Sequence, residues 1–201
     1  MGTRHPRRNP IKIGVGVEGP SDRVFWDKVL HKHFPRVRFD IHNMSNRGKL
    51  IRDAADLLET FRDTHCTAGF LLVDRDDTPC ASGVIDEFAS EVQAEARKPL
   101  DERYLFICVS IRELEAWFLA DGPAITAVLP NVTWEPPKET GTLNAEKELK
   151  ALWKEQHGKN VAFNKIEFAK LLAPKFKPDE AGSRSASFLF FWNRVMSKAR
   201  R

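Results

Sequence analysis

Three acidic residues that follow one short apolar run are the part of this sequence best suited to chemistry. Residues 70–73 (Phe-Leu-Leu-Val) contain no polar break, and Asp74, Asp76 and Asp77 follow within four positions. Such a run is typical of a strand buried on both faces. Because side chains alternate along an extended chain, Asp74 and Asp76 are predicted to point the same way and Arg75 the opposite way. Two carboxylates aimed at one point repel unless a cation lies between them, so we expect Mg²⁺ or Mn²⁺ there.

A third carboxylate, Glu18, follows an earlier segment that is predicted to form a strand. Residues 11–17 alternate branched apolar side chains with small or polar ones, and Gly19 then allows a tight turn. Since the carboxyl ends of parallel strands lie at one edge of a sheet, Glu18 is expected to converge with Asp74 and Asp76. One Glu and two Asp around a divalent ion leave positions for water and phosphate oxygens. Such an ion can polarise a phosphodiester, while Glu18 could shuttle a proton.

Acids at the ends of strands also have a simpler explanation, as solvated loop residues or helix caps. For an isolated Asp-x-Asp that explanation would come first. The Glu18-Gly19 turn after another strand, together with a repeated alternation of strands and helices, favours the metal site.

The elements that must position these acids alternate between strand and helix four times. Strands are predicted at residues 11–17, 36–42, 70–74 and 103–109, and helices at 21–33, 50–61, 84–98 and 112–120. This alternation predicts an α/β fold with a largely parallel, four-stranded, Rossmann-like sheet and helices on both faces. Open sheets of this kind place their ligands at the carboxyl edge, where the acids lie.

From Asp121 onward the alternation stops. Four prolines suggest an irregular loop over residues 121–142. Three more helices are predicted, at 145–157, 164–172 and 187–199. A basic linker framed by Pro174, Pro178 and Gly182 is predicted before the last of these helices. Residues 122–201 are therefore expected to form a mostly helical extension packed on a domain at 11–121. Residues 1–10 are expected to be a disordered basic arm.

One side of the final helix is heavily apolar. The residues on it are Phe188, Phe190, Phe191, Trp192 and Val195. Packing in the core is the interpretation we prefer for these rings, with partner docking and base stacking as alternatives. The basic residues near the C-terminus are then left to contact nucleic acid.

Composition narrows the class of protein. The chain has 201 residues and a formal net charge of +4, but 28 acids accompany 32 basic residues, so charge alone supports a nucleic-acid partner only weakly. No apolar run approaches the roughly 20 residues that span a bilayer, and no membrane association is expected. Three widely spaced cysteines, Cys66, Cys80 and Cys108, show no zinc-binding pattern and suit a cytoplasmic location. The sequence leaves open whether the chain forms an oligomer.

A basic segment after the second predicted strand suits phosphate. Arg47-Gly48-Lys49 opens a predicted helix, where backbone N–H groups and cationic side chains attract anions. A solvated helix start is the alternative, but placement at the same sheet edge as the acids favours phosphate binding. Arg75, between the two aspartates, completes the predicted phosphate-binding set of Arg47, Lys49 and Arg75.

Two motifs carry a resemblance to a known class of protein. Residues 17–22 (Val-Glu-Gly-Pro-Ser-Asp) and 73–76 (Val-Asp-Arg-Asp) resemble the TOPRIM domain of topoisomerases, bacterial primases and OLD-family nucleases. Within that group the chain resembles the DUF4276 family, which has segments similar to residues 112–121 and 184–188. The resemblance implies a Mg²⁺-dependent TOPRIM fold, with Glu18 as acid/base and metal ligand and with Asp74 and Asp76 as metal ligands.

The resemblance also implies a function. It indicates a nuclease that hydrolyses phosphodiester bonds of DNA or RNA, as the effector of a bacterial anti-phage system with an ABC-type ATPase as partner. The alternative is a non-catalytic or latent regulatory subunit of an ATPase complex. Topoisomerase-like strand passage is not expected, because the sole tyrosine, Tyr104, falls inside a predicted strand. Glu113 and Glu115 could hold a second metal or simply begin a helix, and the resemblance favours Glu115 as a further catalytic residue.

Overall fold

The computed structural model describes residues 10–76, 78–95 and 104–200, and it contains one four-stranded sheet within them. All strand pairs are parallel and the spatial order is β2-β1-β3-β4, so the predicted α/β fold is confirmed. The strands are β1 (Lys12–Val17), β2 (Arg38–Asn43), β3 (Ala68–Asp74) and β4 (Leu105–Ser110). Apart from Pro10, the predicted basic arm lies outside the described residues, as does Asp77.

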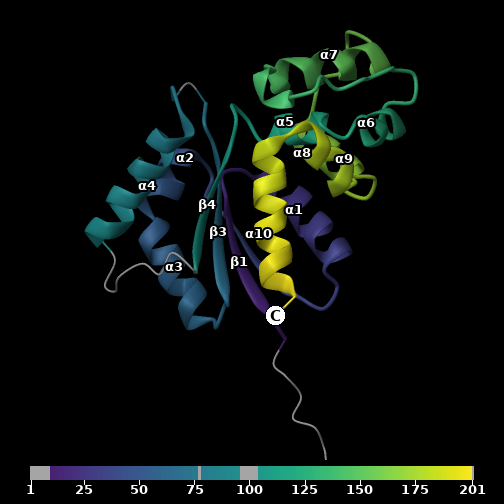
Figure 1. The fold of residues 1–201 in the computed structure, drawn as a ribbon. Helices are drawn as coiled ribbons and strands as arrows, with labels where there is room; N and C mark the ends of the chain where they lie inside the picture. Colours follow the sequence, from purple (N-terminus) through teal and green to yellow (C-terminus); the bar gives the residue numbers. More distant parts are fainter. Residues whose placement is uncertain (1–9, 77, 96–103, 201) are drawn as a thin grey trace, which may run out of the picture.

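Helices cover both faces of the sheet (Figure 1). One face carries α2 (Arg47–Arg52), α3 (Ala54–Asp63) and α4 (Ala81–Glu95), and the other carries α1 (Pro20–His33) and α10 (Ala186–Ala199). The remaining helices gather beyond the carboxyl end of the sheet, and they are α5 (Glu115–Leu119), α6 (Gly122–Val128), η1 (Thr140–Thr142), α7 (Ala145–His157), α8 (Lys165–Leu172) and α9 (Pro178–Arg184). None of the helices in the described ranges is long and apolar enough to cross a membrane.

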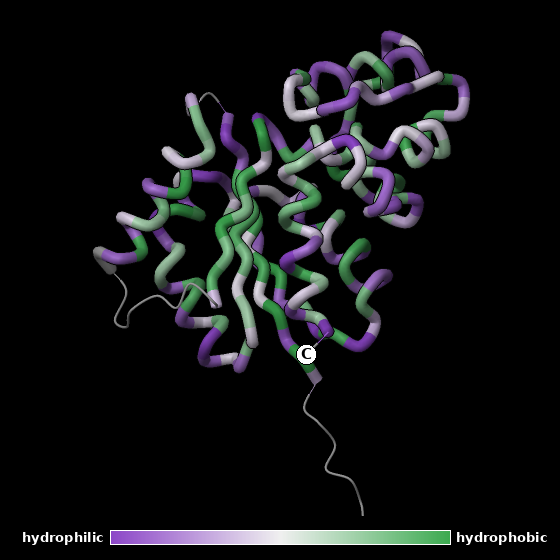
Figure 2. Tube along the Cα trace, in the orientation of Figure 1, coloured by the Kyte–Doolittle hydropathy of each residue, from purple (hydrophilic) through white to green (hydrophobic). Residues whose placement is uncertain are grey.

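The apolar run in β3 is continuous because the strand is buried on both faces. Phe70 and Leu72 pack into the core beneath α1 and α10, whereas Leu71 and Val73 pack into the core beneath α2, α3 and α4. The strands form the most hydrophobic part of the chain trace (Figure 2). Burial of alternate side chains in two separate cores fixes the register of β3, because a slip of one residue would exchange the two faces.

Close approach of α3 to the sheet depends on a glycine in β1. A Cβ atom at Gly14 would lie 2.3 Å from Cγ of Phe61, a buried residue of α3. Any side chain at this position would therefore push the helix away from the strand.

The structure corrects three of the predicted elements. The predicted irregular loop at 121–142 contains α6, and the predicted basic linker contains α9. Pro123 and Pro178 lie in the first turns of these helices, where a proline costs no backbone hydrogen bond. The single helix predicted at 50–61 is two helices, α2 and α3, which meet at Asp53.

The C-terminal helix shares its core with the sheet. Phe191 of α10 is fully buried, and its ring centroid lies 5.0 Å from that of Trp26, 5.9 Å from Phe70 and 5.6 Å from Trp117. These three partners belong to α1, β3 and α5, so one aromatic ring joins four elements. The prediction that the aromatic face of this helix packs in the core is therefore confirmed for Phe188, Phe191, Trp192 and Val195. It is wrong for Phe190, which is exposed.

We expect Phe191→Ala to lower the free energy of unfolding by about 3–5 kcal/mol, because it opens a cavity at this junction. Chemical denaturation checks the value. The matched control is Phe190→Ala, since Phe190 is the preceding residue and its side chain is 47% exposed. The control is expected to cost less than about 1 kcal/mol. Equal losses in both variants would contradict this account of the core.

Candidate functional site

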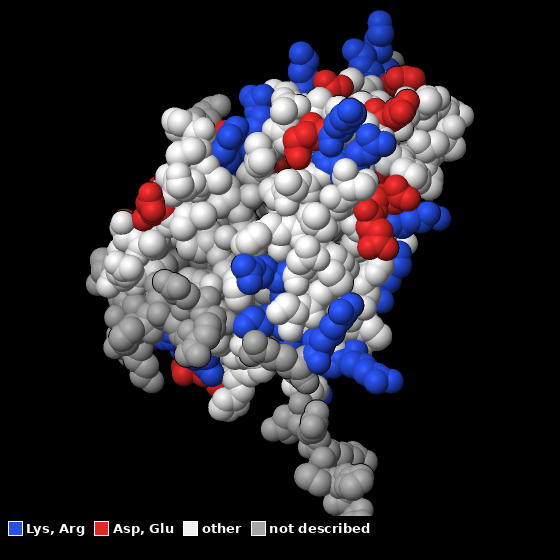
Figure 3. Space-filling model, in the orientation of Figure 1, with Lys and Arg blue, Asp and Glu red and all other residues white. Residues whose placement is uncertain are grey.

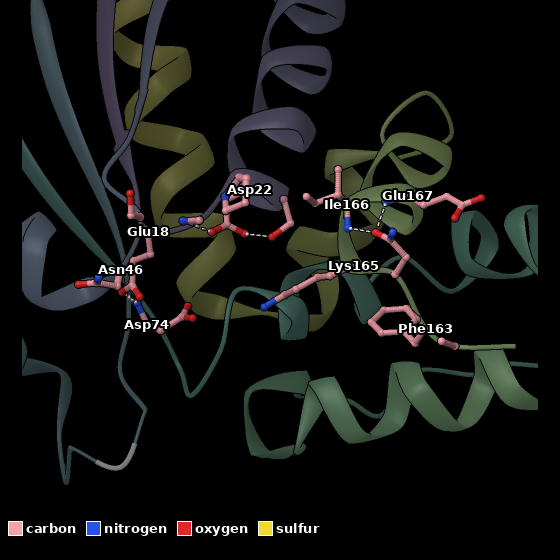
Figure 4. Close-up of a pocket in the computed structure, with 14 residues that line it drawn as sticks. Glu18, Asp22, Asn46, Asp74, Phe163, Lys165, Ile166 and Glu167 are labelled. Atoms are coloured by element: carbon pink, nitrogen blue, oxygen red, sulfur yellow. Dashed lines mark hydrogen bonds between the residues drawn. The ribbon is translucent and has the colours of Figure 1, made fainter.

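A pocket of about 810 Å³ opens at the carboxyl edge of the sheet. One wall is formed by the ends of β1 and β3 and the start of α1, and the opposite wall by the first turn of α8 and the residues before it (Figure 4). The lining residues are Glu18, Gly19, Pro20, Ser21, Asp22, Ser45, Asn46, Asp74, Ala162, Phe163, Asn164, Lys165, Ile166 and Glu167.

Glu18 and Asp74 are joined at the first wall by a direct hydrogen bond. The backbone N–H of Asp74 donates to Oε1 of Glu18 at 2.8 Å. The Oδ1 atom of Asp74 accepts from Oγ of Ser110 at 2.9 Å and from the N–H of Leu114 at 2.7 Å. These bonds engage one oxygen of each carboxylate and hold both groups in place, and the second oxygen of each is available to a ligand.

The surroundings of this pair disfavour two negative charges. Burial raises the pKa of Glu18 to about 7, and the charges of Asp76 and Asp22 add to the rise, while the hydrogen bond from Asp74 opposes it. Burial, and then the nearby charge of Glu18, also raise the pKa of Asp74 well above its usual range. A bound cation or a proton would relieve this repulsion.

Asp22, in the first turn of α1, is a third acid at the same wall. Its side chain is 5% exposed, and Oδ2 accepts from the N–H of Gly19 at 3.0 Å. Burial raises the pKa of Asp22, whereas the positive charge of Lys165 lowers it. This carboxylate therefore caps α1 and also lines the pocket.

Asp76 does not follow the alternation expected from an extended chain. β3 ends at Asp74, and Asp76 has a φ of 49°, in the left-handed region. Its side chain is 51% exposed, and Oδ2 lies 3.6 Å from Nη1 of Arg47. Asp76 is thus near enough to raise the pKa of Glu18 but is not among the residues that line the pocket.

The predicted phosphate-binding residues lie beside the pocket. Arg47 is bound in a network, because its guanidinium donates to the carbonyl of Arg75 and to Thr78 and pairs with Glu87 at 2.7 Å. Lys49 is exposed in the first turn of α2, where its N–H is capped by Asn46. Neither arginine lines the pocket, and phosphate binding by these residues stays a prediction.

Glu115 reaches the pocket through a lysine. Its side chain is 1% exposed, and Oε1 lies 2.5 Å from Nζ of Lys165, which points into the pocket toward the carboxylates (Figure 4). Glu113 instead accepts a hydrogen bond from the N–H of Glu146 at the start of α7. Sequence reasoning missed Lys165, since nothing local links residues that are 50 positions apart.

The donor atoms at the pocket suit a divalent ion. Among the residues that the structure describes, no group of three or more His, Cys, Asp or Glu side chains is arranged to hold a metal. Mg²⁺, however, is commonly held by only one or two carboxylates and completes its shell with water and substrate phosphate. Glu18 and Asp74 fit that pattern, because two desolvated carboxylates lie together and one oxygen of each is available.

Tyr104 lies far from this chemistry. It precedes β4 rather than lying inside it, which corrects the prediction by one residue. The parallel sheet therefore places it at the amino edge, opposite the pocket, and burial raises the pKa of its hydroxyl to about 12.

The outer side of α10 is aromatic and basic. Lys and Arg side chains gather over this helix toward its C-terminal end (Figure 3). The guanidinium of Arg194 lies 5.2 Å from the ring centroid of Phe190 and 5.7 Å from that of Phe106 in β4. Base stacking or partner docking at this surface stays a prediction, separate from the pocket.

Fold and pocket together define an α/β protein with a four-stranded parallel sheet and an acidic site at its carboxyl edge. Residues 17–196 match the family described as a domain of unknown function, DUF4276, and the chain belongs to that family. The family resemblance carried by the two acidic motifs is therefore confirmed.

One solved structure has the same overall fold. It is the C-terminal region of the OLD protein of Xanthomonas campestris pv. campestris, which is 14% identical to this chain with a TM-score of 0.51. The match covers 94% of this chain and 95% of the other. No curated protein matches the sequence.

The raised pKa of Glu18 predicts how stability depends on pH in metal-free protein. Because the folded state holds the proton up to about pH 7 and the unfolded state only to about 4.5, stability falls as pH rises between these values. Glu18→Gln removes this loss. In EDTA we expect the variant to be about 1–3 kcal/mol more stable than wild type at pH 8 and little different at pH 4.5.

Denaturant melts at the two pH values measure the difference. The control is Glu167→Gln, which changes an exposed carboxylate of the same pocket and should show no such pH-dependent gain. A Glu18→Gln variant that is less stable than wild type at pH 8 would rule out the electrostatic account.

Proposed function

We propose that this protein is a metal-dependent nuclease that hydrolyses phosphodiester bonds in DNA or RNA. The observation that carries the proposal is the buried pair of Glu18 and Asp74, whose pKa values are both raised at the edge of an open pocket. A pair of this kind is destabilising without a counter-charge, and a bound cation would supply one. The DUF4276 membership and the shared fold with the OLD C-terminal region support the proposal.

In this proposal Glu18 and Asp74 hold Mg²⁺ or Mn²⁺ through their available oxygens, and Asp76 adds a third carboxylate from its exposed loop. The ion, when bound, polarises the phosphodiester and lowers the pKa of a bound water. The family resemblance also implies an acid/base role for Glu18.

Cationic side chains would orient the substrate. Lys165 extends from the opposite wall toward the carboxylates, where it can contact a phosphate oxygen (Figure 4). Buried Glu115 holds the ammonium group of Lys165, so we assign Glu115 a positioning role rather than a second metal site. Arg47, Lys49 and Arg75 would contact neighbouring phosphates along the strand.

A latent or regulatory subunit is the second candidate, and one contact favours it. Asp76 pairs with Arg47, and Arg47 is itself tied to Glu87, so the described structure keeps Asp76 out of the pocket. Activation would then require a partner that releases Asp76. The family resemblance suggests that this activating partner is an ABC-type ATPase in a cytoplasmic anti-phage system.

Asp74→Asn is expected to abolish both metal binding and hydrolysis. Mn²⁺ should raise the melting temperature of wild type by mass action, and the variant should show no rise. Hydrolysis of labelled DNA and RNA should fall at least about 100-fold. Glu167→Gln, which lies in the same pocket, is the control and should behave as wild type. Unchanged hydrolysis in Asp74→Asn would refute the nuclease assignment.

Asp76→Asn separates the two candidates. If Asp76 joins the metal, the Mn²⁺ concentration needed for half-maximal hydrolysis should rise about 10-fold or more. Melting curves check that loss of the exposed pair with Arg47 leaves stability nearly unchanged, as expected for a surface ion pair. An unaltered Mn²⁺ requirement in the isolated protein would mean that Asp76 stays paired with Arg47, which is what the latent-state candidate expects.

A further inference from the structure

The wall opposite the carboxylates presents an aromatic ring to the pocket. Phe163 lines the pocket and is only partly buried, beside Lys165 (Figure 4). Its ring centroid lies 5.8 Å from that of Trp153 in α7 and 5.7 Å from that of Phe168 in α8. The ring is thus supported from behind by two side chains that are at most 4% exposed.

Packing in the core covers only part of this ring. Trp153 and Phe168 already meet directly, with ring centroids 6.2 Å apart, and close the core between α7 and α8. Phe163 instead contributes apolar surface to a pocket whose other wall carries three acids. A partly exposed ring at this place costs hydration free energy unless a ligand covers it.

Local backbone geometry directs this part of the chain at the pocket. Asn164 is extended, with φ of −113° and ψ of 108°, and its Oδ1 accepts from the N–H groups of Ile166 and Glu167. The Asn164 side chain is thereby committed to capping α8. Its neighbours Phe163 and Lys165 are left to line the pocket, one with an aromatic ring and one with a positive charge.

The chemical groups across the pocket are arranged in an order that would suit the phosphate and the base of one nucleotide. Acids that suit a metal lie at one wall, Lys165 lies between, and the ring of Phe163 lies beyond it. A volume of about 810 Å³ is within the range of small-ligand sites and has room for a base in addition to its phosphate. Aromatic side chains stack on every base, since each has a π-face.

We propose that Phe163 is a stacking platform for an unpaired base, and that the site therefore takes single-stranded nucleic acid. The inference rests on the proposed function, because the phosphate of the same nucleotide is placed at Glu18 and Asp74. In a duplex the bases are stacked on both faces and paired, so none can reach the ring without leaving the helix. Single strands present their bases without that cost.

Binding measured without cleavage tests the proposal. The probe is a fluorescein-labelled single-stranded oligonucleotide, with Ca²⁺ in place of Mg²⁺, and fluorescence anisotropy gives Kd. Two further probes have the same length: a duplex, and a single strand with abasic sites, which keeps the phosphates but lacks the bases. Wild type is expected to bind the base-bearing single strand more tightly than either.

Phe163→Ala should raise Kd for the base-bearing strand about 5- to 100-fold and leave Kd for the abasic strand unchanged. Phe163→Leu keeps apolar packing against Trp153 and Phe168 but removes the π-face, so it should weaken binding as the alanine variant does. If Phe163→Ala fails to fold, Phe163→Leu alone tests base stacking. Phe163→Trp should retain binding. Leu171→Ala, which changes an exposed apolar side chain near the C-terminal end of α8 that does not line the pocket, is the control and should bind as wild type.

Three results would overturn the proposal: unchanged Kd in Phe163→Leu, an equal loss with the abasic strand, or a duplex bound as tightly as the single strand. Hydrolysis with Mn²⁺ separates this outcome from failure of the nuclease assignment. Binding that depends on Phe163 without hydrolysis would reject the nuclease and keep the ligand class. Hydrolysis that is lost in Glu18→Gln but unchanged in Phe163→Leu would support the nuclease and reject base stacking on Phe163.

Discussion

The contact on which the rest of the site depends is the one between Glu18 and Asp74. Parallel pairing of β1 with β3 brings their carboxyl ends level, and the N–H of Asp74 then donates to the Glu18 carboxylate. Desolvation of both groups makes the pair unfavourable in its doubly charged form. The pair is tolerated because two well-packed cores, one on each face of β3, hold the strand in register. The favourable free energy of core packing thus offsets the repulsion between two carboxylates at the carboxyl edge of the sheet. Such an arrangement is typical of sites that bind a counter-ion.

The C-terminal helices turn this edge of the sheet into a pocket. α8 is held against α1 by Lys28 and Lys32, whose ammonium groups donate to the carbonyls of Lys170, Pro174 and Phe176. α10 fills the same face of the sheet with Phe191 and its neighbours. With α8 fixed in this way, Phe163 and Lys165 stand opposite the acids. The extension therefore supplies half of the site, and the sheet supplies the other half.

Family membership and fold similarity concern the chain as a whole rather than the acidic site. DUF4276 membership covers residues 17–196 and so includes both walls of the pocket. The OLD C-terminal region shares the overall fold at 14% identity, which supports the arrangement of elements. The proposed chemistry therefore depends on the geometry of Glu18, Asp74 and Lys165.

Local patterns were enough to predict the alternating strands and helices, the α/β class and the positions of Glu18 and Asp74, because apolar periodicity and buried runs report directly on secondary structure. The helices α6 and α9 were not predicted, because a proline indicates a break in a local pattern even where it begins a helix. The left-handed turn at Asp76 also escaped prediction, because it depends on contacts with Arg47 and with the carbonyl of Arg112. Lys165, Phe163 and the pairing of Glu115 were decided by tertiary structure alone. They come from segments distant in sequence, and only the packing of α8 on α1 and α6 brings them to the acids, where no local pattern could have placed them.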